Sequence, residues 1–352
     1  MNSQIDTKGL TITFVHLGRT IPKYLSLNLD RCIKLFPGYE ILLVGDSAAS
    51  KRMAQRLGVA YFHYDKEMQL GRLGLVAREL SHDSNFRNGY WQKTFDRLIS
   101  LEAVHWDYPD RQLLHVESDV VLFQGFPLDK FLNMDKLAWP KHNHEGDVAS
   151  IVFSPNHHAS TWLTHQLLEE SSKNAAVTDM SALMAIRLRD QGQQTVSLPR
   201  IFSDRNSFGK TANGGTILFD GLHFGTWLLG LDPSAHMGIR ANKVWHGDGH
   251  NPLRESTFIL DGGFLEVLVG EEKYGVVNLH IHSKVLAMFR SNNYAYLGKA
   301  IEKLEGATAH RFFSPSSFFS WLRTMSKIWF RSIWSSKAWL GQMRRLGRKL
   351  SD

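Results

Sequence analysis

Two carboxylates interrupt an apolar segment about a third of the way along the chain. Residues 112–123 read QLLHVESDVVLF, in which Glu117 and Asp119 stand between two apolar runs. A carboxylate at the edge of a hydrophobic core is costly unless another charge compensates it. A divalent cation provides that charge, because hard cations bind carboxylate and phosphate oxygens together. The pattern predicts a metal site, with a solvated turn between two strands as the alternative.

A second polar pattern lies late in the chain, where residues 276–284 read VVNLHIHSK. Side chains alternate between the two faces of a strand, so one face is expected to carry Asn278, His280, His282 and Lys284. Imidazole can ligate a cation, and a lysine ammonium can meet a phosphate as a point charge. The pattern predicts a surface for a metal and a phosphate. The alternative is the solvated polar face of an edge strand.

The elements that must position these groups read as alternating strands and helices. Strands are expected at residues 10–17, 40–45 and 58–64, and helices at residues 22–35, 49–57 and 90–104. This alternation implies a parallel sheet covered by helices, with ligands beyond the carboxyl ends of the strands. Gly18 and Asp46 follow the first two strands. They are therefore expected at the ligand-binding edge.

Three further carboxylates stand where apolar segments meet turns or helices: Asp179, Asp220 and Asp232. Each could contact a substrate hydroxyl or act as a base, although Asp179 could equally cap the helix that follows it. Arg97 lies in the helix expected at residues 90–104. It could reach a substrate phosphate, pair with the acidic triplet or be an ordinary surface arginine.

Taken in order, these motifs resemble those of the GT-A glycosyltransferases, including the glycogenin-like ones. They are most similar to a branch of nucleotide-diphospho-sugar transferases with an Asn-Leu-His-Ile-His-Ser-Lys motif. The matching segments of this chain are Trp91-Thr94-Arg97, residues 114–119, Asp179-Met180, residues 219–221, residues 230–233 and residues 278–284. The resemblance extends over residues 10–290. It implies an α/β GT-A catalytic domain at residues 1–305, with a Rossmann-like, mostly parallel sheet flanked by helices.

The resemblance also implies roles in the acidic and histidine motifs. Asp119 and His282 are expected to hold Mn²⁺ or Mg²⁺ on the diphosphate of a nucleotide-sugar donor, with His280 as the alternative histidine. Glu117 stands where the family has an aspartate, and its longer side chain can reach the ribose or a water instead of the metal. Asp119 therefore ranks above Glu117 as the metal ligand. Lys284 is expected to add positive charge as the phosphate leaves, which makes electrostatic stabilisation the main catalytic effect.

Other residues are assigned by the same resemblance. Gly18, Asp46 and Arg97 are expected to contact the donor. An inverting enzyme needs a carboxylate base near the acceptor hydroxyl. Asp179 and Asp220 are the catalytic candidates for that role.

The C-terminal segment differs from the rest of the chain in charge and composition. Between positions 306 and 351 there are nine Lys and Arg, no Asp or Glu, and four tryptophans. A cationic aromatic helix suits the interface plane of an anionic membrane. We therefore expect residues 306–352 to form an amphipathic helical tail that meets such a membrane through residues 312–349. A helix docked on the catalytic body is the alternative.

Composition limits the remaining classes of function. The single cysteine, Cys32, excludes an intramolecular disulfide and fits a reducing compartment. The chain shows no signal peptide and no apolar run long enough to span a bilayer, so we expect it in the cytoplasm, peripheral on the inner face of the cell membrane. A membrane-associated surface glycan or glycolipid is the expected acceptor.

Other classes are less well supported. Without the tail the chain is nearly neutral, which argues against nucleic acid as a partner. A nucleotidyltransferase usually has a glycine-rich phosphate loop near its first strand, whereas FVHLGRT has one glycine. The remaining alternative is a non-catalytic, membrane-bound protein that binds a nucleotide or glycan.

Overall fold

The computed structural model describes most of the chain before the tail. The described residues are 9–72, 89–202, 208–232, 244–245, 250–290 and 293–305. The helix and the membrane contact expected for residues 306–352 lie outside them. Within the described ranges, no helix combines the length and the hydropathy needed to cross a bilayer.

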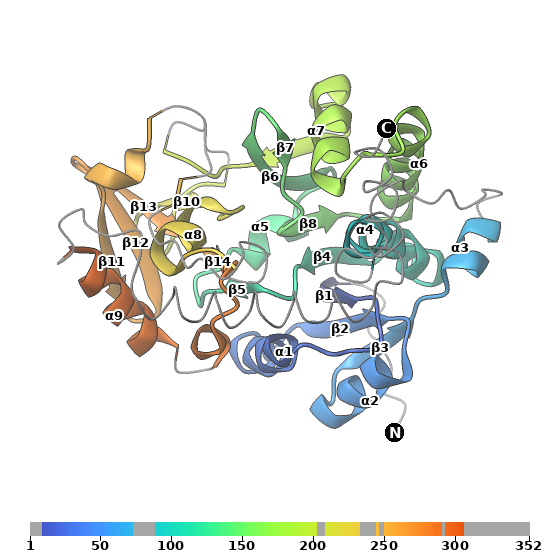
Figure 1. The fold of residues 1–352 in the computed structure, drawn as a ribbon, viewed down its shortest axis with the longest axis horizontal. Helices are drawn as coiled ribbons and strands as arrows, with labels where there is room; N and C mark the ends of the chain where they lie inside the picture. The colour runs from blue at the N-terminus through green and yellow to red at the C-terminus, as the bar shows by residue number, and fades with distance from the viewer. Residues whose placement is uncertain are drawn as a thin grey trace, which may run out of the picture.

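The larger sheet begins with parallel strands joined by helices, as the sequence predicted. Its first four strands lie in the order β3 (Ala60–His63), β2 (Glu40–Gly45), β1 (Leu10–His16) and β4 (Gln112–Val116). The helices between them are α1 (Lys23–Leu35), α2 (Ala48–Leu57), α3 (Lys66–Arg72) and α4 (Tyr90–Asp107) (Figure 1). This half of the sheet is the parallel core of an α/β fold.

The other half of the same sheet changes direction. β8 (Ile151–Ser154) runs antiparallel to β4, and β6 (Leu137–Asn143) runs antiparallel to β8. β7 (Gly146–Asp147) and β9 (Thr195–Leu198) both pair with β6, antiparallel and parallel respectively. The sheet is therefore mixed: the predicted α/β fold with parallel core strands flanked by helices is confirmed, whereas its antiparallel half was not predicted. The connection from β6 to β8 is too short for the helical crossover that parallel strands require.

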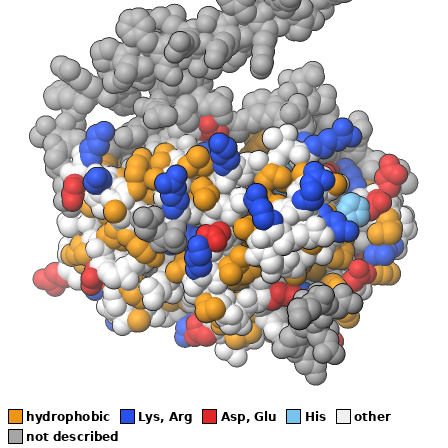
Figure 2. All heavy atoms as spheres, turned by 90° about the horizontal axis from the view of Figure 1, so that it is seen from below, with side chains coloured by type: hydrophobic (Ala, Val, Ile, Leu, Met, Phe, Trp, Pro, Cys, Tyr) orange, Lys and Arg blue, Asp and Glu red, His pale blue; other side chains and the backbone are white. Residues whose placement is uncertain are grey.

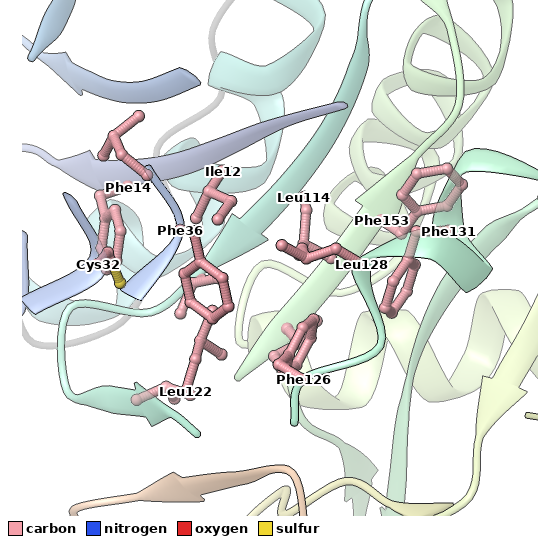
Figure 3. Close-up of a cluster of buried hydrophobic side chains, with 14 of the residues drawn as sticks. Ile12, Phe14, Cys32, Phe36, Leu114, Leu122, Phe126, Leu128, Phe131 and Phe153 are labelled. Carbon is pink, nitrogen blue, oxygen red and sulfur yellow. The ribbon is translucent and has the colours of Figure 1, made fainter. Parts of the chain in front are cut away.

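Both faces of this sheet are buried. Ile12 and Phe14 of β1 pack into a cluster with α1, α2 and α5 (Leu128–Leu132), which includes Cys32 (Figure 3). Val15 points to the opposite face, where α4, α6 (His157–Lys173) and α7 (Asp179–Asp190) pack. Each fully buried large apolar side chain contributes about 1.5–3 kcal/mol relative to its exposed state. These two clusters hold the carboxyl ends of the strands in a fixed arrangement.

A second, smaller sheet lies to one side of the first, at the left of Figure 1. Its strands lie in the order β10 (Thr216–Leu218), β13 (Glu272–Val276), β12 (Phe264–Val269) and β11 (Thr257–Asp261). A third hydrophobic cluster joins it to α8 (His223–Leu229) and α9 (Tyr294–Glu305). Two short 3-10 helices, Pro252–Glu255 and Leu286–Phe289, contribute side chains to the same cluster.

Two short strands connect the sheets. β5 (Val120–Leu122) follows the acidic triplet and pairs antiparallel with β14 (Asn278–His280). The strand predicted over residues 276–284 is therefore much shorter, because Val276 belongs to β13 and the chain turns after His280. A common face for His280, His282 and Lys284 does not exist.

The face at the bottom of Figure 1, which Figure 2 shows from below, carries charged side chains of both signs. Figure 2 shows basic side chains spread over this face among apolar and uncharged ones, with acidic side chains between them and at the rim. Exposed charges of the molecule also pair, as Lys34 does with Asp30 one turn earlier on α1 at 2.6 Å. Such exposed pairs contribute at most about 1 kcal/mol each, so the buried clusters dominate the stability of the fold.

One buried histidine provides a test of this core. His105 of α4 is 0% exposed, with Nδ1 2.8 Å from Ser160 Oγ and Nε2 2.7 Å from the Arg111 carbonyl oxygen. Burial lowers the pKa of His105 from its ordinary value of 6.5 to about 3. Below pH 6.5 the unfolded chain therefore binds a proton that the folded chain does not. As the pH is lowered from about 6.5 towards 3, the free energy of unfolding should therefore decrease by up to ~1.4 kcal/mol per pH unit from this group.

His105→Gln removes this group. We therefore expect the slope of the unfolding free energy against pH to decrease by up to ~1.4 kcal/mol per pH unit, the contribution of one proton. The slope is measured by urea unfolding at several values between about pH 4 and pH 6. His158→Gln is the control, because His158 is an exposed histidine at the start of α6, two residues before Ser160. Equal slopes for the two variants would contradict the prediction.

Candidate metal centre

The carboxyl ends of three neighbouring strands meet at one edge of the larger sheet. β2, β1 and β4 are adjacent, and Asp46, Gly18 and Glu117 follow them in the sequence. The Gly18 N–H donates to Asp46 Oδ1 at 2.8 Å. Gly18 has a φ of 135°, a conformation that residues with a side chain rarely adopt. The predicted location of Gly18 and Asp46 at this edge is confirmed, while their contact with a donor stays a prediction.

The acidic triplet forms a tight turn between β4 and β5. The Val120 N–H donates to the Glu117 carbonyl oxygen at 3.0 Å, and the Glu117 N–H donates to Ser150 O at 3.0 Å. On the other side, Asn28 of α1 donates through Nδ2 to the carbonyl oxygens of Val120 at 2.6 Å and Ser118 at 3.3 Å. These bonds hold the backbone of the turn, so its two carboxylates project from a fixed position.

Pairing of β5 with β14 brings the histidine motif to this turn. His280 lies opposite Val120, and the Ile281 N–H donates to the Asp119 carbonyl oxygen at 2.8 Å. Both strands are fully buried, so the pairing excludes water from its hydrogen bonds. Two motifs about 160 residues apart in the sequence thereby share one site.

Three side chains of this site could bind one metal ion. Glu117, Asp119 and His280 offer ligand atoms that all lie within 4.8 Å of one another. His280 Nε2 is 3.6 Å from Glu117 Oε2 and 3.4 Å from Asp119 Oδ2. Two ligands at right angles around Mg²⁺ or Mn²⁺, each about 2.1 Å from the ion, lie about 3 Å apart. The distances in the site are therefore close to those that a shared ion requires.

One atom of this group would be stabilised directly by a cation. Glu117 Oε2 is buried and accepts no hydrogen bond from the described residues. A buried carboxylate oxygen without a donor is unfavourable, and a metal ion would compensate it. Two carboxylates and one imidazole are also a ligand set that suits Mn²⁺ or Mg²⁺ better than a soft metal. The residues fit the metal that the sequence predicted.

Hydrogen bonding decides which nitrogen of His280 can bind a metal. His280 Nδ1 lies 2.6 Å from the Gly221 carbonyl oxygen, which can only accept, so Nδ1 carries the proton. The Nε2 of the neutral ring then has a free lone pair, and Nε2 is the atom that faces the two carboxylates. This is the arrangement that metal-binding histidines normally have.

His282 has the opposite arrangement. It lies in a turn beyond β14, and its Nδ1 accepts the Asp232 N–H at 2.9 Å. The proton of the neutral ring must then sit on Nε2, which leaves neither nitrogen available to a metal. The structure therefore favours His280 over His282 as the ligand, the reverse of the order predicted from the sequence. Asp232 thus contacts this turn through its backbone N–H.

Arg97 pairs with two of the predicted acidic residues. Its Nη1 contacts Glu117 Oε1, and its Nη2 lies 3.2 Å from Asp179 Oδ2. The three side chains are between 6% and 12% exposed, so Arg97 is not an ordinary surface arginine. Of the alternatives considered from the sequence, the structure shows the pairing with the acidic triplet.

The two carboxylates respond differently to Arg97. Burial alone would raise the pKa of Glu117, but the charge of Arg97 outweighs burial and lowers it. For Asp179, burial raises the pKa and repulsion from Glu117 adds to it, although Arg97 acts in the opposite direction. Arg97 therefore keeps Glu117 ionised, as a metal ligand must be.

Lys284 also reaches the site, although it does not lie on a strand. Its Nζ contacts Asp119 Oδ2, and it lies 5.8 Å from the centre of the Tyr24 ring. Its φ of 54° is in the left-handed region, stabilised by the Lys284 N–H, which donates to Ile281 O at 2.9 Å. The turn after β14 thus brings the ammonium to the acidic triplet.

The two predicted base candidates lie in different surroundings. Asp179 is the first residue of α7, where Thr178 rather than Asp179 caps the helix. It is 4% exposed and belongs to the Arg97 group. Asp220 is 0% exposed, and both of its carboxylate oxygens accept backbone N–H groups. Burial raises the pKa of Asp220, while its bonds to the N–H groups of His280 and Gly225 act in the opposite direction.

The sequence analysis missed the part played by Asn28. Its signal was a polar residue on the apolar face of the helix expected at residues 22–35, between Leu25 and Leu29. Asn278 was expected to face the metal, but its side chain forms two hydrogen bonds with the backbone of Asp220, at 3.0 and 2.9 Å. Both asparagine side chains hydrogen-bond to backbone segments of the site instead of facing the candidate metal group.

No family model matches this chain, and neither does any curated protein sequence. Several solved structures are similar to part of it. One is titled "PaToxG Glycosyltransferase", with 14% identity and a TM-score of 0.36 over 53% of this chain and 71% of that one. A second is "WbbM bifunctional glycosytransferase apo structure", with 12% identity and a TM-score of 0.36 over 56% of this chain and 40% of that one.

A third structure is titled as a glycosyltransferase involved in the glycosylation of the major capsid of PBCV-1. It has 9% identity and a TM-score of 0.32 over 54% of this chain and 81% of that one. These likenesses to glycosyltransferases are partial and distant. They concern about half of the chain and do not identify its reaction.

The Arg97 group provides a test of the site's electrostatics. Arg97→Met should lower the free energy of unfolding by about 3–5 kcal/mol, because it leaves Glu117 and Asp179 buried without their cation. Urea unfolding measures the change. Arg189→Met is the matched control, since Arg189 pairs with Glu170 and is 41% exposed. Loss of Arg189 should cost less than about 1 kcal/mol, because Glu170 keeps Lys173 as a second cation at 3.0 Å, and a similar loss in both variants would contradict the assignment.

Proposed function

We propose that this protein is a metal-dependent glycosyltransferase that moves a sugar from a nucleoside-diphosphate-sugar donor to a hydroxyl acceptor. The observation that carries the proposal is the Glu117, Asp119 and His280 group, with its unpartnered carboxylate oxygen, at the carboxyl edge of the parallel strands. Open α/β sheets bind their ligands at that edge. A cation held there by carboxylates can also bind the diphosphate of a donor.

Each side chain has a distinct part in this reaction. Glu117, Asp119 and His280 Nε2 would hold Mn²⁺ or Mg²⁺, which supplies positive charge to the departing diphosphate. Lys284, already beside Asp119, adds a second positive charge at the same place. Arg97 keeps Glu117 ionised. Electrostatic stabilisation of the leaving group is then the main contribution to the rate.

The remaining donor contacts are proposed from position. Gly18 and Asp46 follow β1 and β2, at the same edge of the sheet as Glu117 after β4, and the nucleoside would extend along this edge. Of the two base candidates, we favour Asp179, because the carboxylate oxygens of Asp220 are occupied by backbone N–H groups. A general base must be within hydrogen-bond reach of the acceptor hydroxyl.

The first test concerns the metal and the donor. The full chain should bind Mn²⁺ in calorimetry and hydrolyse at least one sugar nucleotide in a Mn²⁺-dependent manner. Asp119→Asn and His280→Gln should each weaken Mn²⁺ binding by about 10-fold or more, since each removes one ligand. His158→Gln, which alters an exposed histidine on α6, should change neither property.

Two results would count against the assignment. If His282→Gln weakened Mn²⁺ binding and His280→Gln did not, the order of the two histidines would be reversed. If the unaltered chain hydrolysed no member of a sugar-nucleotide panel with Mn²⁺, the proposed function would be wrong.

We further propose that the acceptor is a glycan or glycolipid at an anionic membrane, reached through the basic tail. Each basic residue at such a surface contributes about 1 kcal/mol, and the attraction falls as salt reduces the Debye length to ~8 Å. Binding of the full chain to phosphatidylserine vesicles in co-sedimentation should therefore weaken with salt. Replacing four tail cations by glutamine should weaken it further: Arg344, Arg345, Arg348 and Lys349.

The control carries the same number of substitutions on exposed positions of α1 and α2: Lys23, Lys34, Lys51 and Arg52. This variant should bind vesicles about as well as the unaltered chain. Equal binding by both variants at every salt concentration would refute a membrane role for the tail.

A further inference from the structure

Asp220 is a buried carboxylate at the junction of three elements. It follows β10, precedes α8 and lies beside β14. Its Oδ1 accepts the Phe224 N–H at 3.0 Å, and its Oδ2 accepts the N–H groups of Gly225 at 2.7 Å and His280 at 3.0 Å. One side chain thus joins the start of α8 to the strand that carries the metal-facing histidine.

The contact between α8 and β14 leaves no free space. A Cβ added at Gly225 would lie 1.9 Å from the His280 carbonyl oxygen and 3.0 Å from Asp220 Oδ2. The Asn278 side chain adds two hydrogen bonds, one to the N–H and one to the carbonyl oxygen of Asp220. The backbone of His280 is therefore confined from several directions at once.

The residue next to Asp220 holds the His280 ring. The Gly221 carbonyl oxygen accepts the Nδ1–H of His280 at 2.6 Å. The consecutive residues Asp220 and Gly221 therefore bind the main-chain nitrogen and the ring of the same histidine. A shift of the Asp220 backbone would move both contacts together.

We propose that Asp220 is a positioning residue, whose carboxylate clamps α8 to β14 and thereby aims His280 Nε2 at the Glu117 and Asp119 carboxylates. This proposal rests on the metal-dependent function proposed above. It replaces a base role for Asp220, because the three backbone N–H groups occupy both carboxylate oxygens. Outer partners of metal ligands typically contribute about 10–100-fold to metal affinity.

Asp220→Asn tests the clamp with almost no change of volume. The amide retains one acceptor but places an NH₂ group against an N–H donor, which forces the backbone of α8 and β14 apart. We expect Mn²⁺ affinity of the full chain to fall by about 10–100-fold. At saturating Mn²⁺, pulsed EPR should show loss of the imidazole nitrogen coupling that the unaltered chain gives and that His280→Gln abolishes.

Asp190→Asn separates positioning from stability. Asp190 is also a buried carboxylate, and it accepts the N–H groups of Gln194 and Thr195 at 2.9–3.0 Å. It lies at the far end of α7 from Asp179, about 16 Å along the helix axis. Its substitution should cost comparable stability but leave the Mn²⁺ affinity and the nitrogen coupling unchanged.

Gly225→Ala tests the same contact from the other side. In an uncrowded helix this change is favourable by about 1 kcal/mol, so a loss of Mn²⁺ affinity would show that the contact with His280 is tight. Normal affinity and nitrogen coupling in both Asp220→Asn and Gly225→Ala would overturn the positioning role. Absence of Mn²⁺ binding by the unaltered chain would instead overturn the proposed metal-dependent function.

Discussion

The short pairing between β5 and β14 is the interaction on which the candidate site depends. It aligns three residues on each strand and places His280 beside the turn that carries Glu117 and Asp119. Both strands are buried, so slipping the register by one residue would turn every side chain to the opposite face. The register therefore determines which histidine meets the carboxylates.

The cost of burying charge explains why so many neighbouring residues are polar. Asp119, Glu117 and Asp179 lie within one buried region, where unpaired carboxylates would be strongly destabilising. Arg97 and Lys284 supply two cations, while Asn28, Asn278 and Asp220 bind the backbone around them. The surrounding polar groups hold the geometry of the site before any ligand arrives, which lowers the entropy cost of binding.

The two halves of the larger sheet contribute differently to this arrangement. The parallel half presents the carboxyl ends of β2, β1 and β4 at one edge, where Gly18, Asp46 and Glu117 follow. The antiparallel half contributes Ser150, whose carbonyl oxygen holds the Glu117 N–H. The second sheet returns the chain through β13 to β14. Both halves of the larger sheet and the chain that returns from the second sheet therefore position the site. Its candidate ligands come from two short segments.

The sequence by itself determined most of the local elements and pointed to the polar motifs that the fold brings together. Periodic apolar residues predicted β1, α1, β2, α2 and α4 closely, because each element buries one face with the spacing of a strand or helix. It also predicted that the acidic triplet and the histidine motif lie together, and the structure brings Glu117, Asp119 and His280 into one group that could hold a metal. It did not determine the direction of β6 and β8, which depends on connections that are too short for crossovers.

Only the tertiary structure decided the roles of individual polar residues. Histidines 280 and 282 have the same chemistry in the sequence, but the Gly221 carbonyl oxygen and the Asp232 N–H select opposite tautomers. Asp220 has the pattern of a catalytic carboxylate, yet its oxygens bind backbone groups from segments four to 60 residues away. A side chain's role depends on which donors and acceptors the fold places beside it, and those partners are distant in the sequence.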